Sequence, residues 1–183
     1  MSRKRKKNLD FKIYTLLLTS IVILTESVKK YTFSILDYDI TYSAFLLPIS
    51  YFVVYVIYKK SNYKKSLLAI LISTVMAFLF DAIMSFSLNE DFYYVSLCGE
   101  LFAYLTSQFF GLRIHHFMKE NTKSSYLLIY LRYVFSLMLF LLVYILFHLD
   151  VWDVTNFVRE YLPILVLFLM ISIPLSILEK KKL

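Results

Sequence analysis

Long apolar stretches alternate with short polar segments along almost the whole chain. Stretches of this kind can cross a hydrocarbon layer of roughly 30 Å, some of them with tilt or a polar end. There are six, at residues 13–28, 40–58, 66–88, 95–118, 126–148 and 158–178. Because lipid offers the backbone no hydrogen-bond partners, continuous apolar segments are expected to span it as helices. The pattern predicts an all-α polytopic membrane protein, a bundle of six transmembrane helices.

The polar segments set the expected domain organisation. Residues 1–12 read as a basic N-terminal segment, residues 13–178 as one transmembrane domain, and residues 179–183 as a basic tail. The connections between the spans are too short to fold alone, and a chain of 183 residues has room for one compact unit. We therefore expect no separate catalytic or regulatory module.

Composition supports a membrane location. Hydrophobic residues make up 60% of the chain and the mean hydropathy is +0.67, whereas soluble domains are roughly 45 to 50% apolar. With only two glycines, the chain cannot build a glycine-rich phosphate loop. The net charge of +7 raises nucleic acid as a partner. However, the basic run at residues 3–7 precedes the first span, where such a run binds anionic lipid, so the expected partner is the bilayer and not nucleic acid.

The distribution of charge predicts the orientation. One set of connections and ends carries fifteen basic residues: Arg3, Lys4, Arg5, Lys6, Lys7, Lys12, Lys59, Lys60, Lys64, Lys65, Lys119, Lys123, Lys180, Lys181 and Lys182. The alternate set carries three, Lys29, Lys30 and Arg159, together with most of the acids. Basic loops stay on the cytoplasmic side, so both termini are expected there.

Acidic residues inside the spans are candidates for function. An ionised side chain at mid-membrane costs about 2.5 to 3.5 kcal/mol, so it is expected to face protein or a water-filled cavity. Glu26 and Glu100 lie near the outer ends of their spans, and Asp81 lies nearer the middle of its own. Asp81 fits a ligand, a proton site or the partner of a base, and it fits structural hydrogen bonding as well.

The fourth span carries a polar stripe. Its members follow one another at steps of four, four, three and four, which puts them on one helical face: Glu100, Tyr104, Gln108, Gly111 and His115. Ser107 lies beside this face. Two interpretations remain open, a ligand-lining stripe and a purely structural polar seam. His115 and His116 have too few companion ligands for a metal, so no metal or other cofactor is expected.

A second stripe, Tyr51, Tyr55 and Tyr58, follows Pro48 and Ser50 in the second span. Its rings suit stacking on a flat heterocycle and suit helix packing equally well.

Several motifs resemble the queuosine precursor transporter family, also called the putative vitamin uptake family. The residues that carry the resemblance are Leu47-Pro48-Ile49-Ser50-Tyr51, Ala103-Tyr104-Leu105-Thr106-Ser107-Gln108, Ile114-His115-His116 with Lys119, and Leu131-Arg132 with Ser136. They occur in the family's order. The chain lacks the family's two acids after Tyr51 and its paired Asn residues after Arg132.

The resemblance implies a six-span protein of the bacterial inner membrane that imports a flat heterocycle, foremost a 7-deazaguanine precursor of queuosine. The expected binding residues are Glu100, Tyr104, Ser107, Gln108, Asp81, Tyr51 and Arg132. One alternative is the substrate-binding subunit of an energy-coupling-factor vitamin importer, which needs an ATPase module. Another is a non-transporting membrane scaffold, and a homo-oligomer is compatible with each. No nucleophile with a base and an orienting group is found, so we expect no enzyme.

Overall fold

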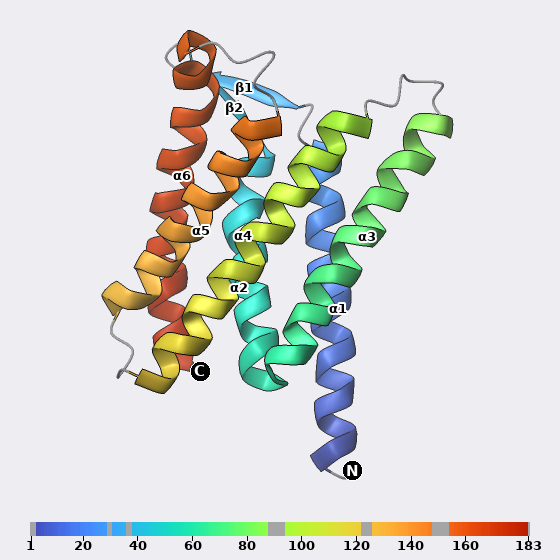
Figure 1. The fold of residues 1–183 in the computed structure, drawn as a ribbon, viewed down its shortest axis with the longest axis vertical. Helices are drawn as coiled ribbons and strands as arrows, with labels where there is room; N and C mark the ends of the chain where they lie inside the picture. The colour runs from blue at the N-terminus through green and yellow to red at the C-terminus, as the bar shows by residue number, and fades with distance from the viewer. Residues whose placement is uncertain are drawn as a thin grey trace.

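A computed structural model describes residues 3–28, 31–35, 38–87, 94–121, 126–147 and 154–182. In order along the chain, its elements are α1 (Arg3–Val28), β1 (Thr32–Ile35), β2 (Tyr38–Thr41), α2 (Ser43–Lys60), α3 (Tyr63–Ser87), α4 (Tyr94–Asn121), α5 (Tyr126–Phe147) and α6 (Val154–Lys182). The helices run alternately up and down in one bundle, so both termini lie at the same end (Figure 1). We call this the terminal end, and the opposite one the hairpin end.

Each of the six predicted segments lies mainly in one helix, so the prediction of an all-α bundle is confirmed in outline. Four helices within the described residues are long and apolar enough to cross a membrane: the Leu9–Val28 part of α1, all of α2 and α3, and the Ile129–Phe147 part of α5. Helix α6 has a shorter apolar stretch, Leu162–Leu178. Helix α4 falls below the same threshold of apolarity, since it carries Glu100, Arg113 and two histidines.

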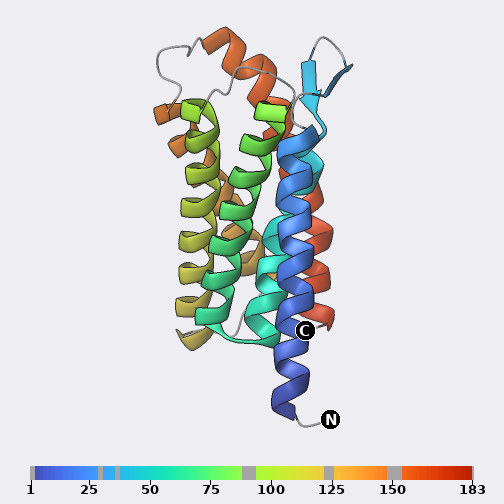
Figure 2. The same ribbon diagram turned by 90° about the vertical axis from the view of Figure 1, so that its right-hand side faces the viewer.

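The predicted helix boundaries need three corrections. Residues 40–42 do not begin the second helix, because Ile40 and Thr41 belong to β2 and α2 starts at Ser43. The first helix is longer than the predicted span of residues 13–28, because the basic residues after Arg3 already form its first turns, which extend below the rest of the bundle (Figure 2). At the other end of the chain, α6 continues to Lys182.

A short β-hairpin caps the bundle at the end opposite the termini (Figures 1 and 2). Strands β1 and β2 pair antiparallel, with Thr32 opposite Thr41 and Phe33 opposite Ile40. The ring of Phe33 packs against Tyr42 at 5.2 Å between centroids. These β-branched and aromatic residues favour strands, but four-residue strands are too short to show a clear alternation of apolar and polar positions.

Helix α3 has the inverse of a soluble helix's pattern. Its buried residues are mainly small or polar: Ser66, Ala69, Ile70, Ser73, Thr74 and Ala77. Its exposed residues are large and apolar, among them Leu68, Leu71, Val75, Leu79 and Ile83. Small residues let backbones approach closely, and large apolar side chains suit contact with lipid tails. The exposed face of α3 is therefore suited to lipid and not to water.

Helix α2 lies at the centre, packed against α1, α3, α4 and α6. Every residue from Val53 to Tyr58 is buried. Next to it, α4 and α5 cross so closely that a Cβ atom added to Gly111 would collide with Oγ of Ser136. A glycine at this position is what allows α5 to bring its polar residues up to α4.

Substitution of Gly111 tests this close approach. We expect Gly111→Ala to destabilise the detergent-solubilised protein by about 1 to 3 kcal/mol, because the new methyl group overpacks the crossing. The added Cβ would lie an ordinary 3.4 Å from Cβ of Ser136, so removal of the hydroxyl should relieve the collision. Adding Ser136→Ala should therefore restore most of the lost thermal stability, measured against Ser136→Ala alone. A double variant as unstable as Gly111→Ala would contradict this account.

Candidate functional site

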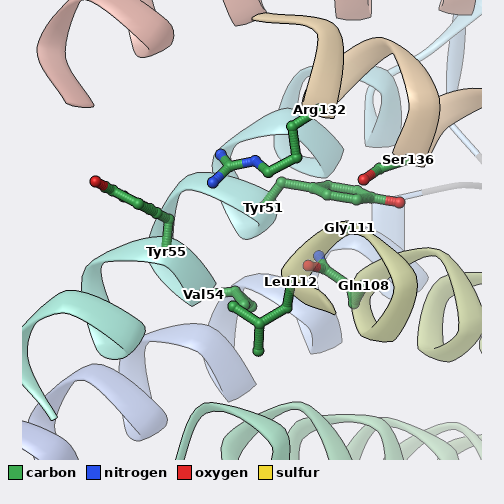
Figure 3. A pocket seen from close by; sticks show the side chains of 8 residues that line it. All are labelled: Tyr51, Val54, Tyr55, Gln108, Gly111, Leu112, Arg132 and Ser136. Atoms are coloured by element: carbon green, nitrogen blue, oxygen red, sulfur yellow. The ribbon is translucent and has the colours of Figure 1, made fainter. Parts of the chain in front are cut away.

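A small cavity lies where α2, α4 and α5 meet, and Figure 3 shows side chains from all three helices converging on it. Its lining consists of Tyr51, Val54, Tyr55, Gln108, Gly111, Leu112, Arg132 and Ser136. The cavity has a volume of about 10 Å³, which is room for about one water molecule. In this conformation it is therefore too small to enclose a heterocycle.

Two hydrogen bonds join α2 to α4 beside the cavity. The Ser107 hydroxyl donates to the backbone carbonyl of Tyr104 at 2.9 Å, so the Tyr51 hydroxyl, with which Ser107 also bonds, is the donor to Oγ of Ser107. One position further along, Nε2 of Gln108 donates to Oγ of Ser50 at 3.3 Å. All four of these side chains are buried. The polar stripe of α4 therefore faces α2 and not lipid.

Tyr104 lies next to this pair of bonds. Its ring meets the ring of Tyr51 edge-on, 6.3 Å between centroids. The side chain is 5% exposed, and the side chains of Ser50, Gln108 and Ser73 are the polar neighbours of its hydroxyl. Tyr104 therefore belongs to the same buried polar group as the two hydrogen bonds between α2 and α4.

Arg132 brings a positive charge to the cavity from α5. The residue is 5% exposed, and its guanidinium lies over the rings of Tyr55 and Tyr133, 5.0 Å and 4.6 Å from their centroids. Attraction between a cation and the face of an aromatic ring is strongest where water is excluded. The tyrosine rings therefore help to hold this guanidinium inside an apolar bundle.

The tyrosine stripe of α2 continues towards the terminal end. His115 is buried edge-on against Tyr55 and Tyr58, at 4.7 Å and 5.2 Å between ring centroids. Nδ1 of His116 hydrogen bonds with the Tyr58 hydroxyl at 3.0 Å, and the ring stacks on Tyr63 from the start of α3. This aromatic cluster joins α2, α3 and α4 just below the cavity.

The predicted binding residues separate into three groups. Tyr51, Gln108 and Arg132 line the cavity. Tyr104 and Ser107 lie directly beside it. Asp81 and Glu100 are half-buried and are not part of its lining; Asp81 is in the last turns of α3 and Glu100 in the early turns of α4, both towards the hairpin end.

Two residues of the cavity, Tyr55 and Ser136, are not among the predicted binding residues. In the sequence, Tyr55 belongs to a stripe that suits helix packing equally well, and Ser136 belongs to a family motif. Both have a signal in the spacing, since Tyr55 follows Tyr51 by one helical turn and Ser136 follows Arg132 by another. Within the described residues, no cluster of three or more His, Cys, Asp or Glu side chains is placed to hold a metal ion.

The bond between Tyr51 and Ser107 predicts unequal effects of its two deletions. Tyr51→Phe removes a donor and leaves Ser107 bonded to the backbone, so it should cost about 1 kcal/mol of stability. Ser107→Ala leaves the Tyr51 hydroxyl buried without its acceptor and should cost more, roughly 1 to 3 kcal/mol. Thermal unfolding of the two purified variants in detergent measures the difference. Equal losses of stability, or a larger loss for Tyr51→Phe, would contradict the assignment of Tyr51 as the donor and Ser107 as the acceptor.

Comparison of the chain with protein-family models, with curated proteins and with solved structures gives no match. The function of the site must therefore be inferred from the chemistry of its own residues.

Proposed function

We propose that this protein is a transporter that imports a small flat heterocycle, foremost a 7-deazaguanine precursor of queuosine, across the bacterial inner membrane. The observation that carries the proposal is a buried group of polar and aromatic side chains inside a bundle whose outer surface suits lipid. Polar and charged groups inside a membrane are costly and mark solute pathways more often than they serve packing alone. Tyr51, Gln108 and Arg132 meet at one cavity between three helices, which is where bundles bind solutes.

The chemistry of these side chains fits a flat, polar ring. Tyr51 and Tyr55 offer aromatic surfaces, Gln108 offers both donors and an acceptor, and Arg132 offers a fork of donors for ring carbonyl or nitrogen atoms. Since the cavity now has room for about one water molecule, import requires the three helices to separate around it. Such rocking of one part of a bundle against another is how many transporters alternate access to a fixed site.

In the proposed topology the chain crosses the membrane six times, with both termini in the cytoplasm. The alternating helices place the termini and the connection between α2 and α3 at one end of the bundle (Figure 1). That connection exposes Lys59, Lys60 and Lys64. A concentration of lysines on one side of the bundle supports a cytoplasmic location for that end.

Cysteine accessibility tests the topology. In a Cys98→Ser background, we expect Thr32→Cys in the exposed hairpin to react with a membrane-impermeant maleimide in intact cells. Asn62→Cys, exposed between α2 and α3, should react only after the cells are permeabilised, because it faces the cytoplasm. Labelling of both positions in intact cells, or the reverse pattern, would overturn the proposed orientation.

Queuosine in tRNA tests the substrate. In a host that cannot synthesise the precursor, deletion of this gene should abolish queuosine from tRNA, and the wild-type gene should restore it. Gln108→Leu keeps the side chain's size but removes its amide, so it should restore at most about one tenth of the queuosine that the wild-type gene restores. Thr106→Val is the matched control, because among the described residues Thr106 bonds to its own helix alone, and it should complement fully. A normal amount of queuosine in the tRNA of the deletion strain would reject a queuosine precursor as the substrate.

A membrane scaffold is the second candidate, and the size of the cavity favours it. A site with room for about one water molecule is what a structural polar seam leaves between packed helices. The same variants separate the two functions. A scaffold tolerates Gln108→Leu, whereas a transporter loses uptake while the amount of protein in the membrane stays constant.

A further inference from the structure

Helix α4 has a second face, opposite to its polar stripe. Residues two positions after the members of the stripe lie about 200° around the helix, at roughly 100° per residue. They are Phe102, Thr106, Phe110, Arg113 and Phe117, and we call them the outer face of α4. The three phenylalanines are 48%, 55% and 66% exposed, and Arg113 is exposed as well. Because α4 lies at the edge of the bundle beside α3, this face is directed towards lipid (Figure 2).

Arg113 is the exception on the outer face. Aromatic side chains suit lipid tails, whereas a charged side chain among acyl chains is costly and extends towards the headgroups. The guanidinium of Arg113 has no hydrogen bond, ion pair or ring contact with any residue that the structure describes. In this it differs from Arg132, whose guanidinium lies over two tyrosine rings inside the bundle. The charge of Arg113 is therefore available to a ligand that comes from the membrane.

The neighbours of Arg113 along α4 fix its depth in the membrane. His116, about one turn further along, stacks on Tyr63 at 4.9 Å between ring centroids. Tyr63 is the first residue of α3 and follows the connection that exposes Lys60. Since three residues of helix rise about 4.5 Å, Arg113 lies within about one turn of the polar terminal end. At that depth its guanidinium reaches the headgroups while the aliphatic part of the side chain lies along acyl chains.

The charge at the terminal end selects among headgroups. Among the side chains that the structure describes, every exposed charged one is basic and lies at this end: Lys12, Lys59, Lys60, Lys64 and Arg113. A guanidinium has paired N–H donors that match two oxygens of a phosphate. A headgroup that also has an ammonium would bring a second positive charge to a basic surface. A phospholipid with a net negative charge is therefore favoured over a zwitterionic one.

We propose that the outer face of α4 binds an anionic phospholipid at the terminal end, with the phosphate on Arg113 and an acyl chain along Phe110 and Phe102. This site is separate from the basic run at residues 3–7, which belongs to α1. It is also separate from the cavity, because Gln108 lies on the opposite face of α4. The proposal goes beyond the import of a heterocycle and does not depend on it.

Thermal unfolding of the delipidated full-length protein in detergent tests the site. Phosphatidylglycerol should raise the unfolding temperature in a saturable manner, because a ligand that binds only the folded protein stabilises it. Phosphatidylethanolamine should require a higher concentration for the same rise. Arg113→Gln should require about tenfold more phosphatidylglycerol for the half-maximal rise, since it loses the charged donors for the phosphate. Lys12→Gln is the matched control, because it removes an exposed positive charge at the same end but from α1, and it should titrate like the wild type.

Three results would overturn the proposal. The first is the same response to phosphatidylglycerol in Arg113→Gln as in Lys12→Gln, which would mean a general attraction of anionic lipid to the basic end. The second is an equal response to the two lipids. The third is an equal rise with sodium phosphate, which would identify free phosphate as the ligand. If Arg113→Gln fails to fold, Arg113→Lys takes its place: it keeps the charge but loses the paired donors, and a titration like that of Lys12→Gln rejects the site.

Discussion

Lipid supplies no hydrogen-bond partners, and this constraint organises the whole bundle. Each backbone amide and carbonyl must be satisfied within its own helix, and each polar side chain must find a partner in the same helix or in a neighbour. Most of the buried serines and threonines do so by donating to a carbonyl one turn earlier, as Ser73 and Thr74 both do to Ile70. Only after these bonds are made does a small set of polar groups remain to join one helix to another.

That remaining set is concentrated between α2, α4 and α5. Tyr51 bonds to Ser107, Gln108 bonds to Ser50, and Arg132 lies over aromatic rings. These contacts depend on close approach of the helices, which small residues permit: Gly111 against Ser136, and Gly99 against Phe147, whose Cβ would lie 2.7 Å from an added Cβ. Packing and polar chemistry are thus coupled, because the same small residues that bring α4 and α5 together also create the cavity that Arg132 and Ser136 line.

The size of the cavity sets a condition on the proposed transport. It has room for about one water molecule, so a heterocycle requires the helices to move apart. Arg132 and Gln108 would contact the heterocycle only in the open conformation, since a transporter presents one site in several conformations.

The sequence by itself determined the helices. Each of the six apolar segments lies mainly in one helix, and apart from the start of α1, which is ten residues earlier than predicted, the ends differ by a few residues, because length, hydropathy and flanking charge are local properties. The period of the stripe from Glu100 to His115 indicated one face turned inward, and all its members are buried except Glu100, which is half-buried. Hydropathy cannot say which helix that face meets. Pairing of α4 with α2 and the separation of Asp81 and Glu100 from the cavity follow from how the helices cross. Those crossings depend on side-chain shape at contacts such as Gly111 with Ser136, so only the tertiary structure decided them.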